Sequence, residues 1–107
     1  MQFRTSERAK RIGKVLRKEL DRRGEDLMLT AAYDAIAWAA GCEDWPDLRR
    51  RLDRDLHPMR IDAAGVAEHL ARRLIVPRGV ALQAYEAVRA RIPNEAPPWE
   101  IRPGRGS

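Results

Sequence analysis

Apolar residues recur every three or four positions along most of this chain, and this spacing constrains its fold more than any other feature. Such a spacing gives a helix one apolar face. No run of alternating β-branched residues, which would favour a strand, interrupts it. The pattern occupies about residues 6–22, 31–40, 45–56, 63–74 and 80–92. The sequence therefore predicts an all-α fold, a compact bundle of about five helices.

Short polar side chains stand where four of these helices should begin. A Ser, Thr, Asp or Asn side chain at this position accepts a hydrogen bond from a backbone N–H of the first turn. The candidate caps are Thr5 or Ser6, Thr30, Asp44 and Asp62. We expect each of them to fix the start of the helix that follows.

Trp45 lies among charged residues and is suited either to the core or to a ligand. Pro46 follows it, and proline is tolerated in the first turn of a helix because its missing N–H has no helical partner there. Leu48, Leu52 and Leu56 then recur every four residues. We therefore expect Trp45 to head this apolar face and close one end of the core, with contact to a ligand as the alternative.

The length of 107 residues suits a single domain with one core. We expect a helical domain over residues 1–92, with a first unit at 6–56 and a second, shorter unit at 62–92. Residues 93–107 are rich in proline and glycine and are expected to form a C-terminal tail.

The two units resemble each other in sequence. Residues 32–36 (AYDAI) match residues 84–88 (AYEAV), and Trp45 has a candidate counterpart in Trp99. Two related helical hairpins would explain the match. Alanine-rich helices also resemble one another by chance, so both explanations stay open.

The segment GCEDWPDL, residues 41–48, contains Gly41, Trp45 and Leu48. With the helices before it, this segment resembles a small helical domain that carries a Gly-aromatic-x-x-Trp-x-x-Leu signature. That domain occurs in uncharacterised bacterial and plasmid proteins and is sometimes joined to glyoxalase-like domains. The resemblance covers about residues 6–55 and departs from the signature at Cys42, where an aromatic residue is usual. It implies a helical fold and no particular activity.

Positive charge is concentrated at the N-terminal end of the chain. Residues 1–23 hold nine Lys or Arg and three Asp or Glu, a net charge of +6. The other residues hold 12 basic and 13 acidic groups, a net charge of −1, so the whole excess of +5 arises from this segment. A charge confined to one segment creates a local field that attracts anions.

On the first predicted helix the basic residues fall beside the apolar stripe and form a ridge. Its members are Lys10, Arg11, Lys14, Arg17, Lys18 and Arg22. Such ridges contact phosphates by neutralising their charge, without reading bases. The alternative is an ordinary solvated helix face.

Residues 31–56 also permit a helix-turn-helix interpretation. Ala37 and Gly41 have the spacing of that motif, and Arg49, Arg50 and Arg51 would then face a groove of the nucleic acid. Two positions that the motif needs to be apolar hold Asp47 and Arg50 instead. We therefore favour the ridge, and we keep Arg49 and Arg50 as candidate contacts.

Residues that could support metal binding or catalysis are sparse. Cys42, His57 and His69 fit no zinc spacing, and no catalytic grouping or phosphate-binding loop is readable. We expect no metal, no cofactor and no enzymatic activity. One cysteine allows no internal disulfide, and no signal peptide or membrane-spanning segment is evident, so we expect a cytoplasmic protein.

The leading hypothesis is a non-enzymatic binding or regulatory module that contacts nucleic acid or a nucleoprotein through its basic N-terminal helix. The alternative is a protein-binding adaptor or inhibitor, such as an antitoxin-like or anti-defence protein of a plasmid or phage. A homodimer is compatible with either.

Overall fold

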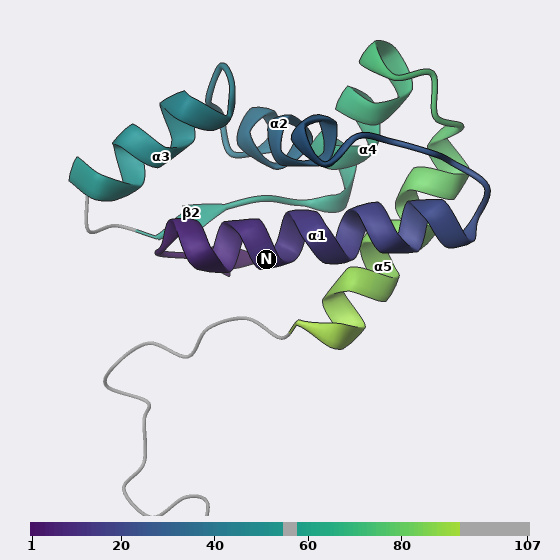
Figure 1. Ribbon diagram of the computed structural model, residues 1–107, viewed down its shortest axis with the longest axis horizontal. Coiled ribbons are helices and arrows are strands. Elements are labelled where there is room, and N and C mark those ends of the chain that lie inside the picture. The colour runs from purple at the N-terminus through teal and green to yellow at the C-terminus, as the bar shows by residue number, and fades with distance from the viewer. Residues whose placement is uncertain (55–57, 93–107) are drawn as a thin grey trace, which may run out of the picture.

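The computed structural model describes residues 1–54 and 58–92 (Figure 1). The predicted all-α bundle is confirmed for this part of the chain. It contains five helices, α1 (Ser6–Arg22), α2 (Leu29–Ala39), α3 (Trp45–Arg54), α4 (Ala63–Arg73) and α5 (Arg78–Arg91). The predicted tail, residues 93–107, lies outside the described residues.

Three helix starts follow the predicted caps. The side chain of Thr5 accepts the N–H of Arg8 at 3.1 Å at the start of α1. At the start of α3 the side chain of Asp44 accepts the N–H of Asp47 at 2.9 Å. At the start of α4 the side chain of Asp62 accepts the N–H of Gly65 at 2.7 Å. In each case the side chain satisfies a backbone N–H that the helix leaves without a partner.

α2 and α5 begin about two residues earlier than predicted. Met28, which offers no side-chain hydrogen bond, holds the N-cap position of α2, so the predicted cap Thr30 lies inside the helix. α5 begins at Arg78, because the carbonyl of Pro77 already accepts the N–H of Ala81 at 3.0 Å. Both helices begin without a side-chain cap, so capping residues could not locate them.

Two short strands were not predicted. β1 (Gln2–Phe3) pairs antiparallel with β2 (Met59–Arg60), and the backbones of Met1 and Ile61 exchange two hydrogen bonds of 2.9 Å beyond them. Each strand has two residues, too few to show an alternating pattern. The pairing ties the N-terminus to the connection between the two halves of the chain, and it buries Phe3 completely.

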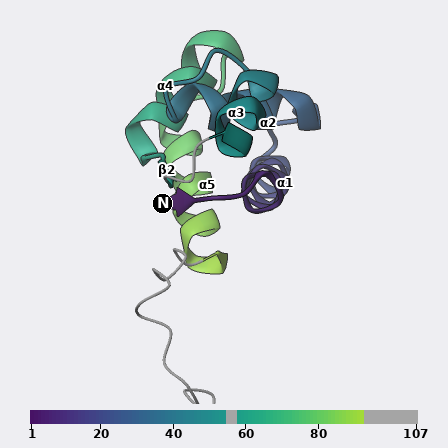
Figure 2. The ribbon, with the colours of Figure 1, turned by 90° about the vertical axis from the view of Figure 1, so that its left-hand side faces the viewer.

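The helices form two pairs that pack on each other. α1 contacts α2, α4 contacts α5, and the pairs join through α1 with α5 and α2 with α4. Figure 2 views α1 nearly end-on, with α5 beside it and α2 and α3 above. The two predicted units therefore share one core, whatever the origin of their sequence match.

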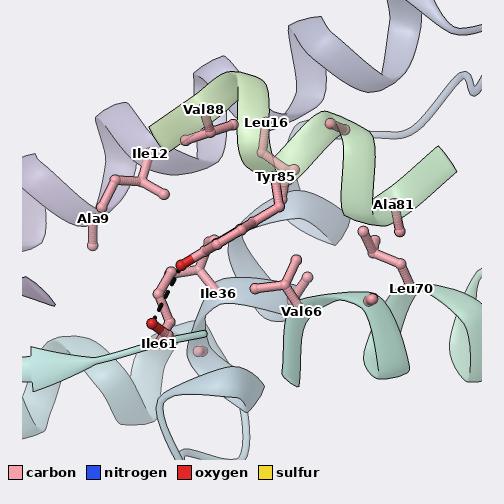
Figure 3. Close-up of a cluster of buried hydrophobic side chains, with 14 of the residues drawn as sticks. Ala9, Ile12, Leu16, Ile36, Ile61, Val66, Leu70, Ala81, Tyr85 and Val88 are labelled. Atoms are coloured by element: carbon pink, nitrogen blue, oxygen red, sulfur yellow. Dashed lines mark hydrogen bonds between the residues drawn. The ribbon is translucent and has the colours of Figure 1, made fainter. Parts of the chain in front are cut away.

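The core lies between the two helix pairs (Figure 3). Tyr85 crosses its centre, 2% exposed, and its hydroxyl donates to the carbonyl oxygen of Ile61 at 3.2 Å. Burial raises the pKa of this phenol to about 12. The surrounding side chains come from four helices, and Leu16, Ile36, Leu70 and Val88 are fully buried among them. None of the helices in the described part of the chain has the length and apolar character needed to cross a bilayer.

Trp45 only partly fulfils its predicted role. It is half-buried against the edge of the core, while Leu48 and Leu52 beyond it are buried; Leu56 lies outside the described residues. Its ring stacks on Tyr33, with centroids 4.7 Å apart. Trp45 thus joins α3 to α2 at the edge of the core and does not close one of its ends.

Tyr33 occupies space that a glycine on α1 leaves open. A Cβ built on Gly13 would lie 2.5 Å from Cδ1 of Tyr33. We predict that Gly13→Ala lowers the free energy of unfolding by about 1–3 kcal/mol, because the stacked ring must shift. Alanine is otherwise the better helix former, so helix propensity alone predicts a gain in stability. Urea denaturation should instead show a loss of stability.

Gly79, on α5, supplies the matched control, since a Cβ there meets nothing within 4 Å. Gly79→Ala should leave stability unchanged or raise it by up to about 1 kcal/mol. Equal losses in the two variants would contradict the close contact at Gly13.

The turn that follows α4 contains a residue with an unfavourable backbone conformation. Ile75 has a φ of 55°, in the left-handed region that a β-branched residue rarely adopts, and its side chain is 86% exposed. The turn lets Val76 donate to the carbonyl of Leu70 at 3.1 Å. We predict that Ile75→Gly raises the free energy of unfolding by about 1 kcal/mol, since glycine takes this conformation at little cost. A lower melting temperature in calorimetry would contradict this.

Candidate functional site

Five basic residues project from the face of α1 opposite the core. We call this set the α1 ridge: Lys10, Arg11, Lys14, Arg17 and Lys18. The apolar residues of the same helix point inward, where Ala9, Ile12 and Leu16 are fully buried. Lys10 is half-buried and the other four ridge residues are exposed. The amphipathic spacing of α1 therefore separates apolar and cationic faces as predicted.

The ridge remains uncompensated by the rest of the described chain. None of its five residues makes an ion pair with a described acid, although Arg22 at the end of the same helix and Arg23 just after it do. Arg17 donates from Nε to the carbonyl oxygen of Leu27 at 3.1 Å, which keeps its charge while fixing its position. Glu7 and Asp21 lie near the two ends of the ridge and are also exposed. The centre of the ridge is thus purely cationic.

A shallow depression of about 370 Å³ lies within the ridge. Lys14, Arg17 and Lys18 border it, together with the half-buried apolar residues Val15 and Leu29. A ligand on the ridge would therefore meet some apolar surface beside its positive charges. This feature was not predictable from residue spacing, because Leu29 reaches α1 only through the turn between the helices.

Arg22, predicted as part of the ridge, belongs to a different arrangement. It lies 3.4 Å from the carboxylate of Glu19, which also contacts Arg23 at 2.9 Å and Arg91 of α5 at 3.4 Å. Glu19 is 3% exposed. The hydrogen bond from Arg23 lowers the pKa of its carboxyl group, and the charges of Arg91 and Arg22 lower it further, whereas burial acts to raise it. Arg22 therefore helps neutralise a buried carboxylate that joins α1 to α5.

Arg49 and Arg50 are exposed on α3. Arg50 and Arg51 both lie close to Asp47, at 3.7 and 3.3 Å, and Asp47 also accepts the N–H of Glu43. That backbone hydrogen bond, followed by the charge of Arg51, lowers the pKa of Asp47. Arg49 makes no ion pair with a described residue. These arginines belong to α3 and the ridge to α1, so their contact with a nucleic acid stays a prediction separate from that of the ridge.

The start of α3 is tied to α2 by a hydrogen bond. The N–H of Trp45 donates to Oδ1 of Asp34 at 3.0 Å, and the ring of Trp45 stacks on Tyr33. α3 therefore sits on the end of α2. Ala37 is buried and Gly41 has a φ of 89°, as the turn of a helix-turn-helix would require, while Arg50 is exposed and Asp47 is half-buried.

Residues with metal-binding or nucleophilic side chains do not gather elsewhere in the described chain. No group of three or more His, Cys, Asp or Glu residues could hold a metal ion there. Cys42 is 4% exposed, and burial raises the pKa of its thiol, which disfavours the reactive thiolate. His57 lies outside the described residues. Comparison with family models, curated proteins and solved structures gave no match, so the resemblance of residues 6–55 to a small bacterial domain stays a prediction.

The buried carboxylate of Glu19 should contribute measurably to stability. We predict that Glu19→Gln lowers the free energy of unfolding at pH 7 by about 2 kcal/mol, because three arginines lose their shared anion. The pKa of Glu19 is lowered in the folded state, so this contribution is present above its unfolded pKa of about 4.3 and is lost as the pH falls through the folded value. Urea denaturation from pH 7 down to about pH 3 should show the variant and the wild type converging.

Glu86, paired with Arg89 at 3.2 Å on the surface of α5, provides the control. Glu86→Gln should change stability by less than about 0.5 kcal/mol. A difference between wild type and Glu19→Gln that stays constant from neutral to acid pH would show that the charge of Glu19 is not what matters.

Proposed function

We propose that the protein is a non-enzymatic binding module whose α1 ridge contacts nucleic acid, alone or in a nucleoprotein. The observation that carries the proposal is the uncompensated cationic face of α1. Lys10, Lys14 and Lys18 follow one another at about 6 Å along the helix axis, since four residues rise by that distance. Arg11 and Arg17 flank them. A row of this kind can neutralise several phosphates of one backbone and release the counterions they held.

The proposed contact would be insensitive to sequence. Lysine and arginine on an exposed helix face reach phosphate oxygens, whereas base readout needs side chains seated in a groove. Among the described residues, the only loop residue that hydrogen-bonds to the ridge is Leu27. We therefore expect affinity to follow charge and salt, with little preference between base sequences.

Fluorescence anisotropy with a labelled 20-base-pair DNA duplex and a single strand of equal length tests this. If all five ridge residues touch phosphate, log K should fall against log salt with a slope of about −4 to −5 on duplex DNA. Replacing Lys10, Lys14 and Lys18 together by glutamate should abolish binding. Absence of binding to both probes at low salt would overturn the proposal.

Two single variants separate the ridge from a general effect of net charge. Lys14→Glu and Arg78→Glu change the charge equally, and both residues are exposed in helices. Lys14→Glu should weaken binding about tenfold or more, and Arg78→Glu should have a much smaller effect. Equal effects would show that total charge, and not the α1 ridge, attracts the nucleic acid.

A second candidate function is supported by the depression within the ridge. Val15 and Leu29 give it an apolar part, and Lys14, Arg17 and Lys18 give it a positive border. An acidic, amphipathic segment of a partner protein would match both features. This would suit an adaptor or inhibitor, of the antitoxin-like or anti-defence kind. A partner retained from lysate after nuclease treatment and at high salt, and lost with Leu29→Glu, would favour it over nucleic acid.

A further inference from the structure

A groove between α2 and α4 is separate from the ridge. The two helices approach closely at one point, where a Cβ built on Gly65 would lie 3.3 Å from Cβ of Ala39. Farther along α4 two adjoining cavities open, of about 360 and 300 Å³, and they share Trp38, His69 and Arg73. Each has the size of a small-ligand pocket. In Figure 2, α4 lies on one side of the molecule and α1 on the other.

The larger cavity combines aromatic and cationic side chains. Trp38 and His69 face each other with ring centroids 5.6 Å apart and planes tilted by 43°. Arg72 and Arg73 complete the lining, and Arg72 is held by Glu68 at 3.2 Å. Arg73 makes no ion pair with any residue the structure describes. This end of the groove therefore places two aromatic rings beside a guanidinium group that has no anionic partner among the described residues.

The imidazole of His69 adds a hydrogen-bonding group to the groove. Its Nδ1 is buried and has no hydrogen-bond partner within the described chain. Because Nδ1 is out of contact with solvent, the nitrogen of His69 that can meet a ligand in the groove is Nε2. Burial and the charge of Arg73 lower the pKa of His69, against the effect of Asp34. The ring is thus neutral near pH 7, with one nitrogen able to accept and one able to donate.

The smaller cavity extends the groove toward acidic residues. Asp34 and Glu43 line it together with Ala31 and Leu74. Asp34 uses Oδ1 to accept the N–H of Trp45, so its second oxygen can accept from a ligand. The groove therefore changes from cationic at Arg72 and Arg73 to anionic at Asp34, with aromatic rings between.

We infer that this groove binds a small ligand that joins a flat, hydrogen-bond-donating ring to an anionic group. The ring would lie against Trp38 and His69, and its donors would face Asp34. The anion would bind Arg73, with Arg72 beside it. A nucleotide has this chemistry, and so does a hydroxylated aromatic carboxylate. The inference does not depend on the function proposed for the α1 ridge, because the two surfaces share no residue.

NMR titration of the ¹⁵N-labelled protein tests this directly. The probes are adenosine 5′-monophosphate and 4-hydroxybenzoate, with adenosine and inorganic phosphate as the separate halves of the nucleotide. The indole N–H of Trp38, assigned with Trp45→Phe and Trp99→Phe, should shift with at least one of the two complete probes. The complete probe that causes this shift should bind about tenfold more tightly than adenosine or phosphate alone, since its ring and its anion contribute together. The relative affinities of the two complete probes identify the source of the anion.

Variants separate the groove from the ridge. Arg73→Gln should lower the affinity of the bound probe by about tenfold, because one charge-assisted hydrogen bond is lost. His69→Gln is a second, milder change that should also weaken it, while Lys14→Glu should leave it unchanged. No shift of Trp38 with either complete probe at about 10 mM would overturn the inference, because binding weaker than this is not specific. Phosphate binding as tightly as the nucleotide, or an unaltered affinity in both groove variants, would overturn it equally.

Discussion

The architecture depends on how α1 is buried. One face of this helix supplies Ile12, Leu16 and Leu20 to the core, where α2 covers one flank and α5 the other. A helix packed in this way on two neighbours can leave only its opposite face to solvent. The lysines and arginines that cannot be buried without partners must gather there. The α1 ridge is therefore a consequence of core packing, and its lack of ion pairs with described acids is the feature that suggests a function.

Two side chains that break the simple division of apolar inside and charged outside hold the helices in position. Glu19 is a buried carboxylate, tolerated because arginines from the end of α1, the residue after it and α5 surround it. Tyr85 brings a hydroxyl into the core and satisfies it on the backbone of Ile61, next to the β1–β2 pair. The first contact joins the two helix pairs directly, and the second ties α5 to the residue that pairs with the N-terminus.

The two candidate surfaces differ in the chemistry they offer. The ridge is convex and exposed, and its strength is charge summed over several residues, which suits a long polyanion. The groove between α2 and α4 is concave and mixes Trp38, His69 and Arg73, which suits one small molecule. Because they lie on different helices, a ligand in the groove need not compete with one on the ridge.

The sequence by itself determined the helices, most of their caps and the cationic face of α1, because these depend on residues three or four positions apart. Thr5, Asp44 and Asp62 act on their own first turns, and the ridge follows from helical periodicity. Only the tertiary structure decided what needs distant residues: the β1–β2 pair, the partners of Glu19, the stacking of Trp45 on Tyr33 and the meeting of Trp38 with His69. Arg22 illustrates the difference, since its place on the helix was predictable while its role beside Glu19 depended on the packing of α1 against α5.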